Sequence, residues 1–157
     1  MKIESAFRPL AEFEGALADL YSSWAEAMEA KSDHDAAFVF FKMSTEERGH
    51  AALVEYQGRL MLDRGSFSRE IEIDVDVDLS ELQTALDQVR ILKGRKSLSS
   101  AEAITMAMEL ERSAAETHFR SALRHADPGL KRLLDCLGSE DRMHFQRLTE
   151  LSNRVSA

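Results

Sequence analysis

Residues 46–50 read Glu-Glu-Arg-Gly-His, and residues 140–144 read Glu-Asp-Arg-Met-His. Each stretch places an acidic residue three positions before a histidine, the spacing that brings two side chains onto one face of an α-helix. Each motif also follows another glutamate. Glu14 lies 33 residues before Glu47 of the first motif, and Glu111 lies 30 residues before Asp141 of the second. The chain therefore contains an internal repeat, and each half contributes two acids and one histidine.

Apolar residues recur at intervals of three and four positions around both motifs, which predicts long amphipathic helices. The two prolines and seven glycines are few enough to agree with this. Pro9 marks the start of the first helix, and Ser99 with Glu102 forms a capping-box pattern at the start of the third. The stripe of the first helix consists of Leu10, Phe13, Leu17, Leu20, Tyr21, Trp24 and Met28. The four helices are expected at about residues 9–31, 35–64, 99–122 and 128–151.

The connection between the two predicted helical hairpins spans residues 65–97. Apolar residues alternate with acids over residues 71–79, which predicts an extended segment, and residues 80–93 are expected to form a short extra helix. The acids of the alternating segment form either a solvated face or a hard-cation site, and we favour the solvated face. The expected fold is all-α, with one domain over residues 1–157. It is a ferritin-like four-helix bundle, in which a long crossover joins two antiparallel helical hairpins.

Charge and cysteine content exclude several classes of protein. The formal net charge of −8 argues against a nucleic-acid binder, because phosphate recognition needs a basic surface. Cys136 is the only cysteine, which excludes an intramolecular disulfide and a four-cysteine iron site, and we expect a free, buried thiol. The start of the chain lacks a signal-peptide core, and no apolar run reaches the length of a membrane span. We therefore expect a cytoplasmic protein with no membrane partner.

The repeated acids and histidines fall on helix faces that should point into the core, where an unneutralised charge is costly. Carboxylates are hard anionic ligands that can bridge two metal ions, and one neutral imidazole per ion leaves coordination positions open. This ligand set favours two iron ions, with manganese or zinc as substitutes, although zinc more often recruits thiolates or several histidines. The candidate metal ligands are Glu14, Glu47, His50, Glu111, Asp141 and His144.

Two polar rings share a helix face with the lone glutamates. Tyr21 lies seven residues after Glu14, and His118 lies seven residues after Glu111, which is about two helical turns in each case. We predict catalytic roles for Tyr21 and His118, the latter as a hydrogen-bond donor, a proton shuttle or an extra ligand. The alternative for His118 is a core histidine bonded to a neighbouring carboxylate.

Two parts of the chain resemble a known family. Glu14, Tyr21 and the motif at residues 46–50 resemble the first half of the rubrerythrin-type ferritin-like proteins. Glu111 and the motif at residues 140–144 resemble their second half. The resemblance covers nearly the whole chain apart from the crossover, and it implies iron-dependent handling of peroxide or oxygen.

The resemblance also implies that the six candidates hold two iron ions, with Glu47 and Asp141 in the positions that can bridge them. Three departures stand out. Asp141 is one methylene shorter than the glutamate expected there. Met108 and Ala114 flank Glu111, where rubrerythrins carry an additional glutamate one turn away. No four-cysteine rubredoxin segment is present, so electrons would come from a separate donor or from ferrous ion itself.

The leading hypothesis from the sequence is a di-iron peroxidase that reduces peroxide or dioxygen while its iron is oxidised. A ferroxidase, which oxidises incoming iron for storage or delivery, fits the same residues. The alternative from another class is a metal-independent helical bundle that acts as a partner-binding or assembly module. We also expect the chain to form a homodimer or a larger homo-oligomer.

Overall fold

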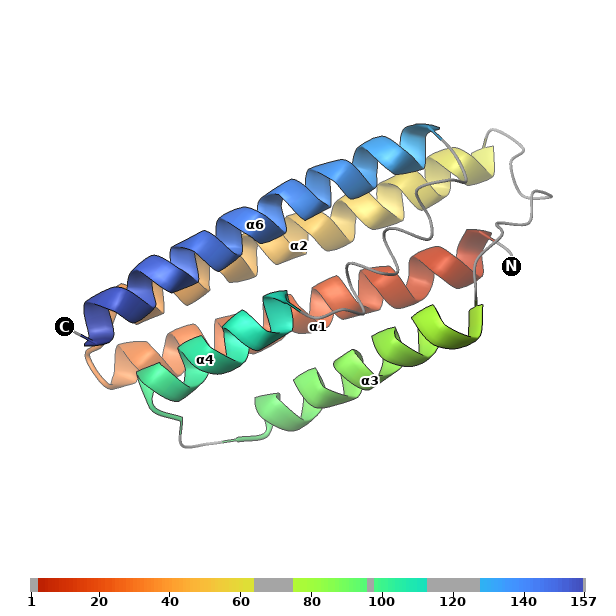
Figure 1. Ribbon diagram of the computed structural model, residues 1–157. Helices are drawn as coiled ribbons and strands as arrows, with labels where there is room; N and C mark the ends of the chain where they lie inside the picture. Colours follow the sequence, from red (N-terminus) through yellow and green to blue (C-terminus); the bar gives the residue numbers. More distant parts are fainter. Residues whose placement is uncertain (1–2, 64–74, 96–97, 113–127, 157) are drawn as a thin grey trace.

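The computed structural model describes residues 3–63, 75–95, 98–112 and 128–156. All regular elements within these ranges are α-helices, which confirms the predicted all-α class (Figure 1). None of these helices combines the length and apolar character that a membrane crossing needs. The helices are α1 (Ile3–Ala30), α2 (His34–Asp63), α3 (Val75–Lys93), α4 (Ser100–Glu111) and α6 (Pro128–Ser156).

The helices lie side by side as a bundle (Figure 1). α1 and α2 run antiparallel and are in contact, α4 and α6 form a second antiparallel pair, and α2 also contacts α6. α3 packs on α1 and returns the chain to the end of the bundle where α4 begins. The predicted third helix, over residues 99–122, is described only as far as Glu111, and its remaining residues lie outside the described ranges.

The turn between α1 and α2 is formed by polar side chains and one residue of unusual backbone conformation. Ser32 has φ of 60°, the left-handed conformation that commonly ends a helix. An Asp33 carboxylate oxygen accepts a hydrogen bond from the backbone N–H of Ala36 at 3.2 Å, as an N-cap residue does. The Ser100 hydroxyl donates to the other Asp33 oxygen, so the cap of α2 is also bound to the start of α4.

The predicted capping box at the start of α4 is confirmed. The backbone N–H of Glu102 donates to the Ser99 hydroxyl at 3.2 Å, and the backbone N–H of Ser99 donates to the Glu102 carboxylate at 3.3 Å. Two of the N–H groups that lack a helical partner at this end are therefore satisfied.

The predicted start of the first helix at Pro9 is wrong, because α1 begins at Ile3 and contains this proline. A proline in a helix removes one backbone hydrogen bond, and the turns before it need another source of stability. Phe7 contributes to it, because its ring is buried and lies over Gly58 of α2, 3.5 Å from where a Cβ atom of that residue would be.

The predicted extended segment is also wrong over Val75, Val77 and Leu79, because these residues belong to α3. Five alternating positions are too few to outweigh a helix that continues from the next segment, since propagation of an existing helix is easier than nucleation. The expected short helix over residues 80–93 is confirmed, with an earlier start. Residues 71–74 lie outside the described ranges.

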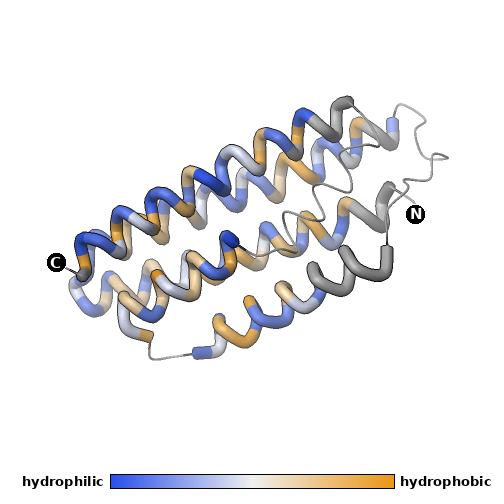
Figure 2. The backbone as a smooth tube through the Cα atoms, in the orientation of Figure 1, coloured by the Kyte–Doolittle hydropathy of each residue, from blue (hydrophilic) through white to orange (hydrophobic). Residues whose placement is uncertain are grey.

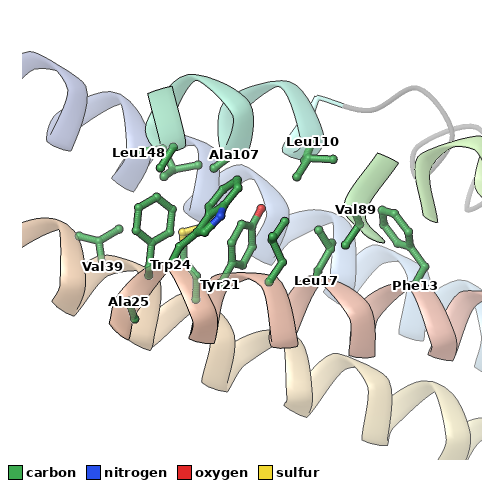
Figure 3. Packing of buried hydrophobic residues seen from close by; sticks show 14 of the residues in the cluster. Phe13, Leu17, Tyr21, Trp24, Ala25, Val39, Val89, Ala107, Leu110 and Leu148 are labelled. Carbon is green, nitrogen blue, oxygen red and sulfur yellow. The ribbon is translucent and has the colours of Figure 1, made fainter. Parts of the chain in front are cut away.

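The core lies between α1, α2, α4 and α6 and under α3 (Figure 3). All seven residues of the predicted stripe on the first helix are buried. Trp24 and Phe40 pack edge to face with their ring centroids 5.5 Å apart, and Tyr21 packs against Phe40 at 5.9 Å. Hydrophilic residues interrupt the apolar ones along α2 and α6 (Figure 2), and part of this polarity lies inside the bundle.

One expectation about the core fails. Cys136 is a free cysteine as predicted, but its side chain is exposed. The buried positions beside it, Leu133 and Leu137, lie three residues before and one after it. A leucine-rich stretch of helix still has a solvent face, and Cys136 lies on that face.

Candidate metal centre

The structure brings all six candidate ligands together in the middle of the bundle. Glu14 comes from α1, Glu47 and His50 from α2, Glu111 from the end of α4, and Asp141 and His144 from α6. Glu14 and Glu47 are fully buried and His50 and His144 are 1% exposed, which is unusual for ionisable side chains. Glu111 is also buried and Asp141 is partly buried.

These side chains form two overlapping groups that can each hold a metal ion. One group consists of Glu14, Glu47 and His50, and within it one ligand atom of each residue lies within 4.8 Å of the others. The second group consists of Glu47, Glu111, Asp141 and His144, with the same spacing. Glu47 belongs to both groups, which is the arrangement of a carboxylate that bridges two ions.

The two oxygens of Glu47 point to different histidines. Oε2 lies 2.8 Å from Nδ1 of His50, and Oε1 lies 2.9 Å from Nδ1 of His144. The two imidazole rings stack across the centre, with centroids 5.6 Å apart and planes inclined by 25°. Each half of the carboxylate therefore serves one side of the site.

Three buried atoms on the His144 side make no hydrogen bond within the described part of the chain: Oε1 of Glu47, Oε2 of Glu111 and Nδ1 of His144. They nevertheless converge, because Nδ1 of His144 is 2.9 Å from the Glu47 oxygen and 3.6 Å from the Glu111 oxygen. Buried polar atoms normally find hydrogen-bond partners. Three donor atoms that converge on one buried point suit a metal ion, so these residues fit such an ion.

Asp141 enters only one of the two groups. The resemblance places both Glu47 and Asp141 in bridging positions, and the geometry favours Glu47 for that role.

Tyr21 lies beside the centre, on the buried face of α1 (Figure 3). Its hydroxyl donates a hydrogen bond to Oε1 of Glu111 at 2.8 Å, which leaves Oε2 of that carboxylate to face His144. Burial and the negative charges of Glu111 and Glu47 raise the pKa of Tyr21 well above its usual value, so the phenol is neutral. The other predicted catalytic residue, His118, lies outside the described ranges.

Two outer glutamates, not predicted from the sequence, orient the histidines. Nε2 of His144 lies 2.9 Å from the carboxylate of Glu46, and Nε2 of His50 is bonded to the carboxylate of Glu140. Each glutamate is the first residue of one motif, and each bonds the histidine of the other motif. A carboxylate that accepts the Nε2 proton leaves Nδ1 free to bind a metal. The repeated Glu at the start of both motifs was the available signal for this role.

The outer contacts differ between the two halves. The Arg147 guanidinium donates two hydrogen bonds to Glu46, at 2.7 and 3.4 Å. Although burial opposes the charge of this carboxylate, Arg147 and His144 lower the pKa of Glu46 below its usual value. The position equivalent to Arg147 in the first half is 94 residues earlier and holds Leu53, which carries no charge.

Without a metal ion, two of the buried acids hold their protons more strongly than usual. Burial, together with the charge of Glu14, raises the pKa of Glu47 to about 7. Burial and the charges of Glu14, Glu111 and Glu47 raise the pKa of Asp141 to about 9. Burial opposes protonation of His50, but hydrogen bonds to Glu14 and Glu47 raise its pKa to about 12. The centre therefore favours the binding of positive charge, either as protons or as metal ions.

Comparison of the chain with models of known protein families, with curated proteins and with solved structures finds no match.

Proposed function

We propose that this protein is a di-iron carboxylate oxidoreductase of the rubrerythrin type, with a ferritin-like bundle, that reduces peroxide or dioxygen. The observation that carries the proposal is Glu47, a fully buried carboxylate with one oxygen in each of two ligand groups. A metal-independent bundle would gain nothing from placing four acids around one buried point, because each acid loses its hydration there.

The two groups assign ligands to two ions. The first ion would be held by Glu14, Oε2 of Glu47 and Nδ1 of His50. The second would be held by Oε1 of Glu47 with the three ligands of α4 and α6: Glu111, Asp141 and His144. Four carboxylates match the charge of two divalent ions, and these hard oxygen donors suit iron or manganese better than zinc.

When bound, two ferrous ions supply two electrons, which is the number needed to reduce one hydrogen peroxide to water. The remaining chemistry belongs to the chain. The Tyr21 hydroxyl holds its proton against Oε1 of Glu111 and fixes the orientation of that carboxylate. Trp24 and Phe40 close the centre on the Tyr21 side with packed rings, which limits access of bulk water. Among the described residues, the first group has fewer candidate ligands than the second, so an oxidant would have more room there.

Anaerobic titration with ferrous ion tests the proposal directly. The metal-free protein should take up two ions per chain, and Glu47→Ala should lose most of this uptake because it removes a ligand from both sides. His144→Ala should retain one ion more readily than Glu47→Ala. Glu55→Ala is a matched control, since Glu55 is an exposed glutamate on the same helix and should leave uptake at two. Uptake of no iron by the unmodified protein, or equal uptake in Glu47→Ala, would refute the proposal.

Thermal melting separates the proposal from a metal-independent partner-binding module. An ion that binds only the folded state stabilises it by about 2.7 kcal/mol when free metal is a hundredfold above the Kd. A bundle whose polar centre is purely structural would melt at the same temperature with and without ferrous ion. Turnover assays with peroxide and with dioxygen then distinguish the peroxidase from the ferroxidase.

A further inference from the structure

The two halves of the centre differ in how firmly their outer glutamates are held. The side chain of Glu46, which is bonded to His144, is 27% exposed, and the Arg147 guanidinium donates to both of its oxygens. The side chain of Glu140, which is bonded to His50, is 40% exposed and forms no other hydrogen bond or ion pair with the described residues. One outer glutamate is therefore held from two sides, and the other is held from one side only.

The contact with Arg147 fixes the orientation of Glu46. A guanidinium group is planar, and its N–H groups match the two oxygens of a carboxylate, so the pair is directional. Arg147 is itself only 19% exposed, which limits its own freedom. A carboxylate that is held in place keeps the imidazole bonded to it in one orientation. The His144 ring is therefore held more firmly than the His50 ring.

The candidate ligands differ between the halves in the same sense. Among the described residues, the group that contains His144 has four members, and the group that contains His50 has three. An ion leaves a site only after its ligands release it one after another. Fewer ligands and a less firmly held imidazole both make release easier on the His50 side.

The charge of Arg147 does not explain retention by itself, because a positive charge near the centre repels metal ions. Arg147 pairs with Glu46, however, so the two opposite charges largely offset each other at the metal position. The exposed charge of Glu140 is screened by water. The contribution of Arg147 is therefore to the orientation of the His144 side rather than to its charge.

The register of the helices shows where a matching arginine on the other half would lie. α2 and α6 are in contact and run antiparallel (Figure 1). Leu53 lies seven residues after Glu46 on α2, about two turns on and on the same face. Glu140 lies seven residues before Arg147 on α6, also on the same face. Two turns forward on α2 and two turns back on α6 lead from the Glu46–Arg147 pair to positions 53 and 140, so an arginine at position 53 can reach Glu140.

From these observations we infer that the two metal positions differ in exchange. The ion on the His144 side is retained, the ion on the His50 side exchanges with the solution, and Arg147 is the positioning residue that sets the difference. The inference rests on the proposed di-iron centre and deepens it. The exchangeable position is where ferrous ion from solution enters and leaves as a substrate, whereas the retained ion stays with the protein.

Isotope exchange measures the retention of each ion without catalysis. The metal-free protein is loaded anaerobically with two ferrous ions per chain from a stock enriched in a stable heavy isotope. It is then mixed with excess ferrous ion of natural isotopic composition, and mass spectrometry follows the label that stays on the protein. One labelled ion per chain should leave at least about tenfold more slowly than the other. His50→Ala should lose the fast ion and His144→Ala the slow ion, which assigns the two rates.

Substitutions at the two equivalent positions test the role of Arg147. Arg147→Leu should speed release of the slow ion about tenfold, because Glu46 is then held by His144 alone. Leu53→Arg should slow release of the fast ion, because it gives Glu140 a second partner. In a Glu140→Ala background, Leu53→Arg should have no effect. A general loosening of the bundle cannot slow release, so the slower release in Leu53→Arg separates positioning from a merely structural role.

Two matched controls change the same charges elsewhere. Arg142→Leu removes an exposed arginine from α6, and Phe41→Arg adds one at a 62% exposed position of α2, far along the helix from Leu53. Both should leave the two rates unchanged. A single rate for both ions, no slowing in Leu53→Arg, or an equal effect in the controls would overturn the inference, while two bound ions would leave the proposed function in place. Uptake of no iron would overturn both.

Discussion

At the scale of single residues, the centre depends on which atom of each histidine faces inward. Nδ1 of both histidines points to Glu47, and Nε2 of each is bonded to an outer glutamate from the other motif. The candidate ligands themselves follow from residue type, spacing and the repeat. The outer bonds do not, because they join residues that are 90 and 98 positions apart and depend on how α2 and α6 are placed against each other.

Removal of an outer glutamate should weaken metal binding without removal of a ligand. Glu140→Ala frees the His50 ring to rotate and to change tautomer, and we expect a 10- to 100-fold loss of ferrous-ion affinity at unchanged stoichiometry. Isothermal titration calorimetry under anaerobic conditions measures both quantities. Glu140→Gln should recover part of the affinity, since its amide oxygen can still accept the Nε2 proton. Glu150→Ala, an exposed site on the same helix, should have no effect, and an equal loss there would point to a general change in the bundle.

At the scale of helices, patterns confined to one element were predicted well, and patterns that depend on a neighbour were not. The capping box of α4 involves residues three positions apart, and the structure confirms it. The early start of α1 depends on Phe7 packing over Gly58 of α2, a contact that no spacing reveals. The alternation before residue 80 was misleading for another reason, because the helix expected over residues 80–93 continues back to Val75.

Asp33 joins three elements, so its loss should cost more than the loss of an ordinary cap. It caps α2 through Ala36, follows the last residues of α1, and accepts a hydrogen bond from Ser100 of α4. We expect Asp33→Ala to lower the free energy of unfolding by about 1–2 kcal/mol, the upper part of the range for N-caps. Ser99→Ala, which breaks only the α4 capping box, should cost about 1 kcal/mol. Urea denaturation of the metal-free protein measures both, and a larger loss for Ser99→Ala would contradict this ranking.

At the scale of the whole molecule, several side chains at the centre of the metal-free bundle have raised pKa values. Asp141, with a pKa of about 9, and Glu47, with a pKa of about 7, hold protons that the unfolded chain releases near pH 4. The pKa values of His50 and His144 are raised to about 12 and 10. Above pH 6.5, their usual value, these two histidines therefore also hold protons that the unfolded chain has released. At these four residues the folded protein therefore binds more protons than the unfolded chain throughout the neutral range.

This proton excess fixes the sign of the pH dependence. The stability contributed by Glu47 and Asp141 is present at low pH and is lost as pH rises from about 4 to about 9. The stability contributed by His50 and His144 is present below about pH 6.5 and is lost as pH rises toward about 12. For each proton held only by the folded state, the free energy of unfolding falls by about 1.4 kcal/mol for every unit by which the pH rises. The melting temperature of the metal-free protein should therefore fall between pH 5 and pH 9, whereas bound metal replaces the protons and should flatten the curve. A metal-free melting temperature that rises over this range would show that the acids are not proton-bound.

Each outer glutamate bonds the histidine of the other half of the chain, and this pattern bears on how the chain evolved. Glu46 holds His144 and Glu140 holds His50, which is the pattern that two identical hairpins related by a two-fold axis would produce. The chain thus has the layout of an ancient pair fused into one polypeptide. Fusion lets the halves diverge independently, and the contrasts of Arg147 with Leu53 and of Asp141 with Glu47 are differences that two identical subunits could never have acquired.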